Sequence, residues 1–185
     1  MPGPMLHLSI AKKVNPNGSI AYYVGNLAPD TVKGRENKDK AHFLSIPDIE
    51  MAMKQFAKIA DNEFLKGILL HLFVDRKWWE AHLSDFAERE GEGWYTKYNK
   101  ENLKMTSYAF HNTEWAYELF KQIENWDYDG FAETGFITKE NVKWVSSELL
   151  ITNKLEASTI FSPALIENFT NDTADDFIKW RSCIL

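Results

Sequence analysis

The chain has little cysteine, no long apolar run and no excess of basic residues. Its one cysteine, Cys183, cannot form an internal disulfide, so the fold does not require an oxidising compartment. No apolar segment reaches the roughly 18 residues that a membrane-spanning helix needs. The N-terminal sequence MPGPMLHLSIAKKV also lacks the features of a secretory signal. We therefore expect a cytoplasmic protein without a transmembrane segment.

The overall composition limits the class of protein further. A formal net charge of −6 argues against a protein that mainly grips a nucleic-acid backbone, because such proteins present a basic surface. With 185 residues, 44% of them hydrophobic, the chain is long enough to bury a full core. The 14% of aromatic residues argues against intrinsic disorder. We expect one globular domain over residues 1–185.

The spacing of apolar residues is helical along almost the whole chain, and alternating strand-like runs between turn signals are missing. Pro29 is expected to end the second helix, and the polar run TVKGRENKDK is expected to form an exposed loop. Thr138 and Ser162 are expected to be helix N-caps. The sequence predicts an all-α, single-domain bundle of about seven helices, over 5–14, 19–27, 47–60, 61–90, 100–124, 138–153 and from Ser162 onward.

Two polar residues, His71 and Asp75, interrupt the most apolar part of the chain, GILLHLFVDRKWWEAH. Burying either group without a partner is costly. Their spacing of four residues places them about 40° apart on one helix face. An imidazole and a carboxylate stacked in this way suit zinc or a similar divalent ion. Taken alone, the pair is equally consistent with a buried histidine that is hydrogen-bonded to a helical aspartate.

Three further residues of ligand type precede this pair. His7 lies in the first helix, Asp30 ends GNLAPD, and His42 lies in AHF. Within GNLAPD, Gly25 would permit close packing and Pro29 would leave Asp30 projecting from a turn. A single turn aspartate more often caps or forms the turn. A helical bundle would bring all five residues together, and the set therefore predicts a metal site.

In the segments LHLSIA, GNLAPD, AHF and GILLHLFVD, over about residues 5–82, the sequence resembles the zinc-dependent phospholipase C family. The superfamily of these enzymes includes fungal single-strand nucleases. The resemblance implies a helical bundle that holds one to three zinc ions. It also implies that Asp30, His42, His71 and Asp75 form one metal site, that Asp75 reaches a second metal with His7, and that Asp30 lies near the attacking water.

The chain departs from the family in two places. In characterised members the N-terminal residue supplies its amine and carbonyl to a metal, whereas here six residues precede His7, so the second site is incomplete, uses another ligand or does not exist. For a third metal, His82 lies within about 20° of His71 on the helix face. The other pair, His111 and Glu114, is spaced by three residues instead of the family's four. These three residues are possible additional ligands, with a polar pocket lining or a solvated helix face as the alternative.

The function expected from these residues is metal-dependent hydrolysis of a phosphate ester by metal-activated water, of the phosphodiesterase or phospholipase C type. The metal would be zinc or another divalent transition metal, and the substrate a small-molecule or lipid-derived phosphate ester. Arg76 and Lys77 could hold a substrate phosphate, although simple solvent exposure is the alternative. Two other functions stay open: a non-catalytic, metal-stabilised interaction module, and a His-Asp-type phosphohydrolase. The chain contains no HD dipeptide, which argues against the latter.

Overall fold

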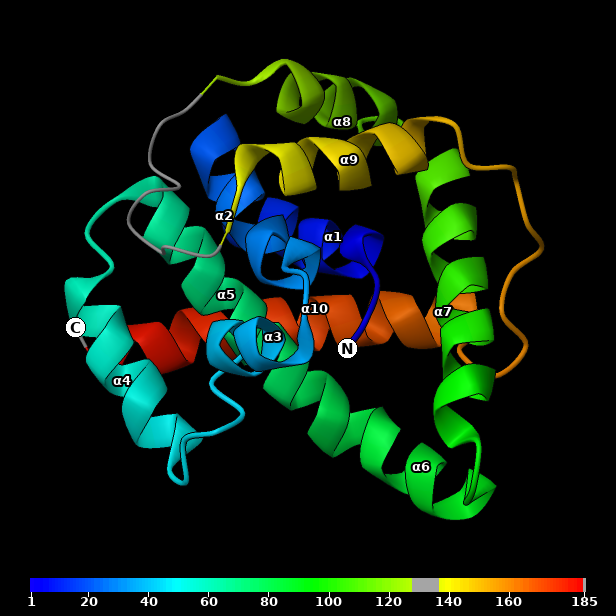
Figure 1. Ribbon diagram of the computed structural model, residues 1–185, viewed down its shortest axis with the longest axis horizontal. Coiled ribbons are helices and arrows are strands. Elements are labelled where there is room, and N and C mark those ends of the chain that lie inside the picture. The colour runs from blue at the N-terminus through cyan, green and yellow to red at the C-terminus, as the bar shows by residue number, and fades with distance from the viewer. Residues whose placement is uncertain (128–136, 185) are drawn as a thin grey trace.

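The computed structural model describes residues 1–127 and 137–184, and these residues form helices joined by loops (Figure 1). Among them there is no strand, which confirms the predicted all-α class. Within the same ranges, no helix is both long and apolar enough to cross a membrane. The helices are α1 (Pro4–Val14), α2 (Ile20–Thr31), α3 (Arg35–Ala41), α4 (Ile49–Ile59), α5 (Glu63–Trp78), α6 (Ser84–Glu90), α7 (Trp94–His111), α8 (Ala116–Asn125), α9 (Lys139–Leu150) and α10 (Pro163–Ser182), with a π-helical turn at Trp79–Leu83 between α5 and α6.

Local sequence signals explain most helix starts. Thr138 and Ser162 accept hydrogen bonds from the backbone N–H groups of Asn141 and Leu165, as predicted for N-caps. Asn62 caps α5 in the same way through Leu65. Because each cap satisfies a backbone donor that the helix leaves unpaired, these starts are determined by short-range chemistry.

The core forms where α2 packs along α5, with α1 between α2 and α10 (Figure 1). In Figure 1, α8 and α9 lie side by side along one edge, and α7 stands at another. Large aromatic side chains that are almost completely buried fill the interior, including Phe64, Trp78, Phe86, Tyr98, Phe120 and Phe177. The Trp78 indole donates to the Tyr98 hydroxyl at 2.9 Å, so its polar N–H is satisfied inside the core.

Two expectations for the N-terminal third were wrong. The polar run 31–40 is not a loop, because α3 forms inside it after Gly34, whose φ is +83°. An i, i+4 ion pair of 2.8 Å between Glu36 and Lys40 supports this short helix. Pro29 does not end α2, which continues to Thr31. A proline removes one backbone donor, and so close to a helix terminus the loss is tolerated.

The later helices also differ from the prediction. The expected helix over 61–90 is helical from Glu63 to Glu90, but the π-helical turn interrupts its α-helical geometry. The expected helix over 100–124 is instead two helices, because α7 begins at Trp94 and ends at His111, and α8 begins at Ala116. The described residues therefore contain more helical elements than the seven expected. The stretch NWDYDGFAETG, expected to be irregular between the helix over 100–124 and Thr138, falls largely on residues 128–136, which lie outside the described residues.

Candidate metal centre

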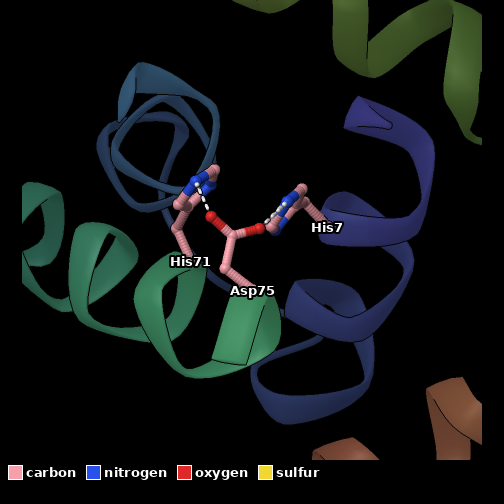
Figure 2. A group of neighbouring side chains, drawn as sticks. All are labelled: His7, His71 and Asp75. Atoms are coloured by element: carbon pink, nitrogen blue, oxygen red, sulfur yellow. Dashed lines mark ion pairs between the residues drawn. The ribbon is translucent and has the colours of Figure 1, made fainter. Parts of the chain in front are cut away.

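The structure brings together the five residues predicted as metal ligands, from four different helices. His7 comes from α1, Asp30 from the last turn of α2, and His42 from the end of α3. His71 and Asp75 lie one turn apart on α5. Figure 2 shows the Asp75 carboxylate between the imidazoles of His7 and His71. That these residues bind a metal stays a prediction, but their convergence is a structural fact.

The Asp75 carboxylate is the centre of the cluster. Its Oδ2 lies 3.1 Å from His71 Nε2 and 3.5 Å from His42 Nε2. Its Oδ1 lies 3.3 Å from His7 Nε2. The side chain is only 4% exposed, and neither oxygen has a partner in hydrogen-bonding geometry. A buried carboxylate without a hydrogen-bond donor is rare, and a bound cation is one partner that would satisfy it.

Asp30 forms one possible set of metal ligands together with His42 and His71. Its Oδ1 lies 3.3 Å from His42 Nε2, and Asp30, His42 and His71 offer ligand atoms within 4.8 Å of one another. Unlike Asp75, its side chain is 29% exposed. The sequence predicted that Asp30 projects from a turn, whereas it projects from the last turn of α2. In either position it is the carboxylate of the cluster that reaches solvent.

Backbone carbonyl groups determine which ring nitrogen of His71 and of His42 carries the hydrogen in the neutral side chain. His71 Nδ1 lies 2.8 Å from the carbonyl oxygen of Asn26, and His42 Nδ1 lies 2.8 Å from that of Lys38. A carbonyl only accepts, so each Nδ1 carries the hydrogen. In the neutral rings both Nε2 atoms therefore present lone pairs, and these atoms lie 3.3 Å apart. Such backbone contacts are the usual means of orienting a metal-binding imidazole.

Four of the distances between acceptor atoms of the cluster have the length expected around a tetrahedral divalent ion. Zinc–nitrogen bonds of about 2.0–2.1 Å at tetrahedral angles correspond to about 3.3 Å between neighbouring ligand atoms. Four of the six distances among the ligand atoms of His42, His71, Asp75 and Asp30 lie between 3.1 and 3.5 Å. Since two imidazole lone pairs and two carboxylates converge without a donor between them, a cation is the natural partner.

His7 adds a second possible set of metal ligands to the cluster. Its ring is 0% exposed, stacks on the His71 ring with centroids 4.0 Å apart, and has no hydrogen bond at either nitrogen. Its Nε2 lies 3.8 Å from Asp30 Oδ2, in addition to its contact with Asp75. His7, His71 and Asp75 thus form a second possible ligand set. The two sets share His71. Asp75 directs Oδ1 to His7 and Oδ2 to His71 and His42, so its two oxygens could face two different ions.

Burial and neighbouring charges shift the pKa values of the cluster in opposite directions. Burial alone would raise the pKa of Asp75, but the nearby His71 and His7 rings lower it well below its usual value. For Asp30, burial is likewise outweighed by His42 and His71, and its pKa is lowered. Burial and the neighbouring His71 lower the pKa of His7. For His71, the charge of Asp75 outweighs burial and raises the pKa. Both carboxylates are therefore charged and ready to bind a cation at neutral pH.

One side of the cluster faces a large cavity of about 1310 Å³ that opens to solvent. Asp30, His42 and Asp75 line it, so a ligand in the cavity could reach the converging atoms. Residues 1–4 form part of its wall, held there by a hydrogen bond of 2.8 Å from the Tyr98 hydroxyl to the Met1 carbonyl. Most of the remaining wall is apolar, with Leu27, Leu44, Ile49, Leu72, Trp79, Leu83 and Trp94 among its residues.

The three additional ligand candidates do not join the cluster. His82 lies in the π-helical turn, where the wider helix changes the angular position of each residue, and its ring packs against Trp78 and Phe169. Burial lowers its pKa. The uninterrupted α-helix assumed in placing His82 on the same face as His71 was wrong, because His82 lies in the π-helical turn. His111 is the last residue of α7 and contacts the Thr152 carbonyl at 2.9 Å, while Glu114 is exposed beyond the helix end. The predicted one-helix pair was therefore also wrong.

Arg76 and Lys77, the two cations considered for holding a substrate phosphate, both form ion pairs. Arg76 lines the cavity, but it is paired with Glu80 at 2.8 Å and with Glu50 at 3.3 Å. Lys77 is paired with Asp176 at 2.7 Å. Neither cation is thus free for a phosphate. Sequence reasoning missed the carbonyl groups of Asn26 and Lys38, because backbone partners leave no mark in residue type.

Comparison with protein-family models, with curated proteins and with solved structures finds no match to this chain. The assignment of the cluster therefore depends on its own geometry. Five ligand-type residues from α1, α2, α3 and α5 converge at the inner end of an open cavity, as two overlapping sets of three possible ligands. The arrangement is that of a candidate metal centre with access to solvent.

Proposed function

We propose that the protein is a zinc-dependent hydrolase of phosphate esters, similar to the zinc-dependent phospholipases C. The observation that carries the proposal is the meeting of two imidazole lone pairs and two carboxylates, without a donor, at the edge of an open cavity. His42, His71, Asp75 and Asp30 would hold one ion. His7 and Asp75 would contribute to a second.

The bound ion would supply Lewis acidity, lowering the pKa of a water molecule and polarising the phosphoryl oxygen. Asp75 is too deeply buried to exchange protons with solvent easily, so its role is to provide negative charge next to the ion. Asp30 is partly exposed on the cavity side, so its carboxylate can accept the proton of the attacking water.

The reaction is an exchange of one P–O bond for another. The water oxygen forms a bond to phosphorus, and the bond from phosphorus to the ester oxygen breaks. The proton that Asp30 takes from the water passes to the leaving oxygen, which departs as an alcohol. A phosphodiester thus yields a phosphomonoester and an alcohol, with no oxidant, reductant or further reactant required.

A metal that served only the fold is the competing interpretation, because four protein ligands could close a coordination shell. The open cavity and the exposure of Asp30 favour the enzyme over such an interaction module. A His-Asp-type phosphohydrolase would use the same ligand types, but nothing in the cluster favours it over the proposed function.

The test combines metal analysis of the purified protein with a screen of chromogenic phosphodiesters and phosphomonoesters. Wild type should retain zinc and hydrolyse at least one of the two classes. Asp75→Asn should lose bound metal and more than about 100-fold of the activity, since even outer partners of a metal site can cost that much. Asp85→Asn, an exposed carboxylate outside the cavity lining, is the matched control and should behave as wild type. Wild type that bound no transition metal, or equal activity of Asp75→Asn, would contradict the proposal.

A further inference from the structure

One face of α3 is directed at the cavity. The residues of this helix and its C-cap that line the cavity include Arg35, Lys38, Asp39 and His42. Relative to Arg35 these positions are i, i+3, i+4 and i+7, which share one face of a helix. The helix therefore carries a predicted metal ligand at one end and two cations on the same face.

These two cations differ from the other basic side chain of the cavity. Arg76 is engaged by Glu50 and Glu80. Over residues 1–127 and 137–184, by contrast, no ion pair joins Arg35 or Lys38 to a carboxylate. Lys40, on the same helix but outside the cavity lining, is paired with Glu36. The unpaired cations of α3 are thus the ones that face the cavity.

The distances along α3 place these cations beside the cluster. With a rise of about 1.5 Å per residue, Lys38 lies about 6 Å and Arg35 about 10 Å along the helix axis from His42. Both residues are exposed. A phosphate held at the metal ligands would therefore leave any second anionic group of the same molecule within reach of Lys38 or Arg35.

We propose that Arg35 and Lys38 form an anion-binding subsite that selects phosphate esters carrying a second negatively charged group. The inference rests on the proposed function and names the substrate class of that site. The substrate is a phosphate ester with a second anionic group, a carboxylate or another phosphate, separated from the first phosphate by about the length of one helical turn. Guanidinium and ammonium groups suit such oxyanions, because their hydrogen bonds are charge-assisted. Asp39, on the same face, is a single opposing charge.

Binding of two matched probes to the zinc-loaded, full-length chain tests the subsite by calorimetry. The probes are 3-phosphoglycerate and glycerol 3-phosphate, which share the phosphate and differ in one carboxylate. Wild type should bind 3-phosphoglycerate about tenfold more tightly, the size expected of a hydrogen bond to a charged group. The double variant Arg35→Gln/Lys38→Gln should lose this preference while retaining zinc. Lys40→Gln, on the same helix and outside the cavity lining, should keep it.

Equal affinity of wild type for both probes, or an unchanged preference in the double variant, would overturn the subsite. Because the measurement does not depend on turnover, the two proposals fail separately. A zinc protein that shows the preference but hydrolyses no phosphate ester contradicts the hydrolase and supports the subsite. A phosphohydrolase without the preference contradicts only the subsite.

Discussion

Gly25 of α2 and Gly67 of α5 lie in direct backbone contact, and this contact brings the two halves of the cluster together. A Cβ on Gly67 would overlap the Tyr22 carbonyl oxygen and would lie 2.9 Å from the Gly25 carbonyl carbon. A Cβ on Gly25 would likewise overlap the backbone of Phe64. The close approach lets His71 reach the Asn26 carbonyl. Helix spacing and imidazole orientation are thus set by the same pair of glycines.

Replacing Gly67 with alanine should therefore damage both the fold and the site. The added methyl group has to push α2 away from α5, since its neighbours are backbone atoms. We expect the free energy of unfolding to fall by about 1–3 kcal/mol, as for other overpacked cores, and zinc affinity to fall with it. Chemical denaturation and zinc titration measure the two effects. The exposed Lys58→Ala on α4 is the control, and a Gly67→Ala protein as stable as this control would show that the helices are not in contact.

Removing His71 should affect metal content more than removing His7. His71 belongs to both possible ligand sets, whereas His7 belongs to one. We expect His71→Asn to lose nearly all bound zinc and His7→Asn to keep the ion held by His42, Asp30 and the α5 pair. Metal analysis of folded protein, checked by circular dichroism, gives the stoichiometry. His111→Asn, which lies outside both sets, should match wild type. Full zinc content in His71→Asn would rule out the assigned centre.

Zinc binding should strengthen as the pH rises from 6 to 8. The pKa of metal-free His71 is raised above its ordinary value of 6.5, because the charge of Asp75 outweighs burial. Below that pKa the ion has to displace a proton, and above it the lone pair is free. Asp75 contributes no proton in this range, because its pKa lies well below its ordinary value. Affinity should rise by about tenfold per pH unit for each proton displaced.

Calorimetry in two buffers of different ionisation enthalpy counts the protons released on zinc binding. The number of protons released on zinc binding should be larger at pH 6 than at pH 8. An affinity that did not vary between these pH values would mean that zinc displaces no proton from His71.

Zinc should also slow amide exchange in α3. His42 is the one predicted ligand that α3 provides, and most residues of this helix are exposed. Fixing His42 to an ion shared with α2 and α5 should therefore stabilise a helix that has few buried contacts of its own. Hydrogen–deuterium exchange with and without zinc measures this protection over residues 35–42.

Helix α8, which provides none of the five predicted ligands, serves as an internal reference and should exchange at the same rate in both states. His42→Ala should abolish the protection of α3. Protection of α3 that persisted in this variant would mean that the ion is held without His42.

The accuracy of the sequence prediction varied along the chain for physical reasons. Caps such as Thr138 and Ser162 act within three residues, and both were predicted correctly. The π-helical turn at His82 depends on how the aromatic rings around Trp78 pack, and no local pattern announced it. Helix α7 likewise ends at His111, although the helical spacing of apolar residues continues beyond it.

The sequence by itself determined the all-α class and the residue types of the cluster, because helical periodicity and a four-residue His–Asp spacing are local properties. Only the tertiary structure decided that His7, Asp30 and His42 meet the pair on α5, since this depends on how α1, α2 and α3 pack together with α5. It also decided that His82, His111 and Glu114 lie outside the cluster and that the Arg35–Lys38 face of α3 looks into the cavity. Contacts between residues far apart in sequence fix these positions, and residue spacing along a chain does not encode them.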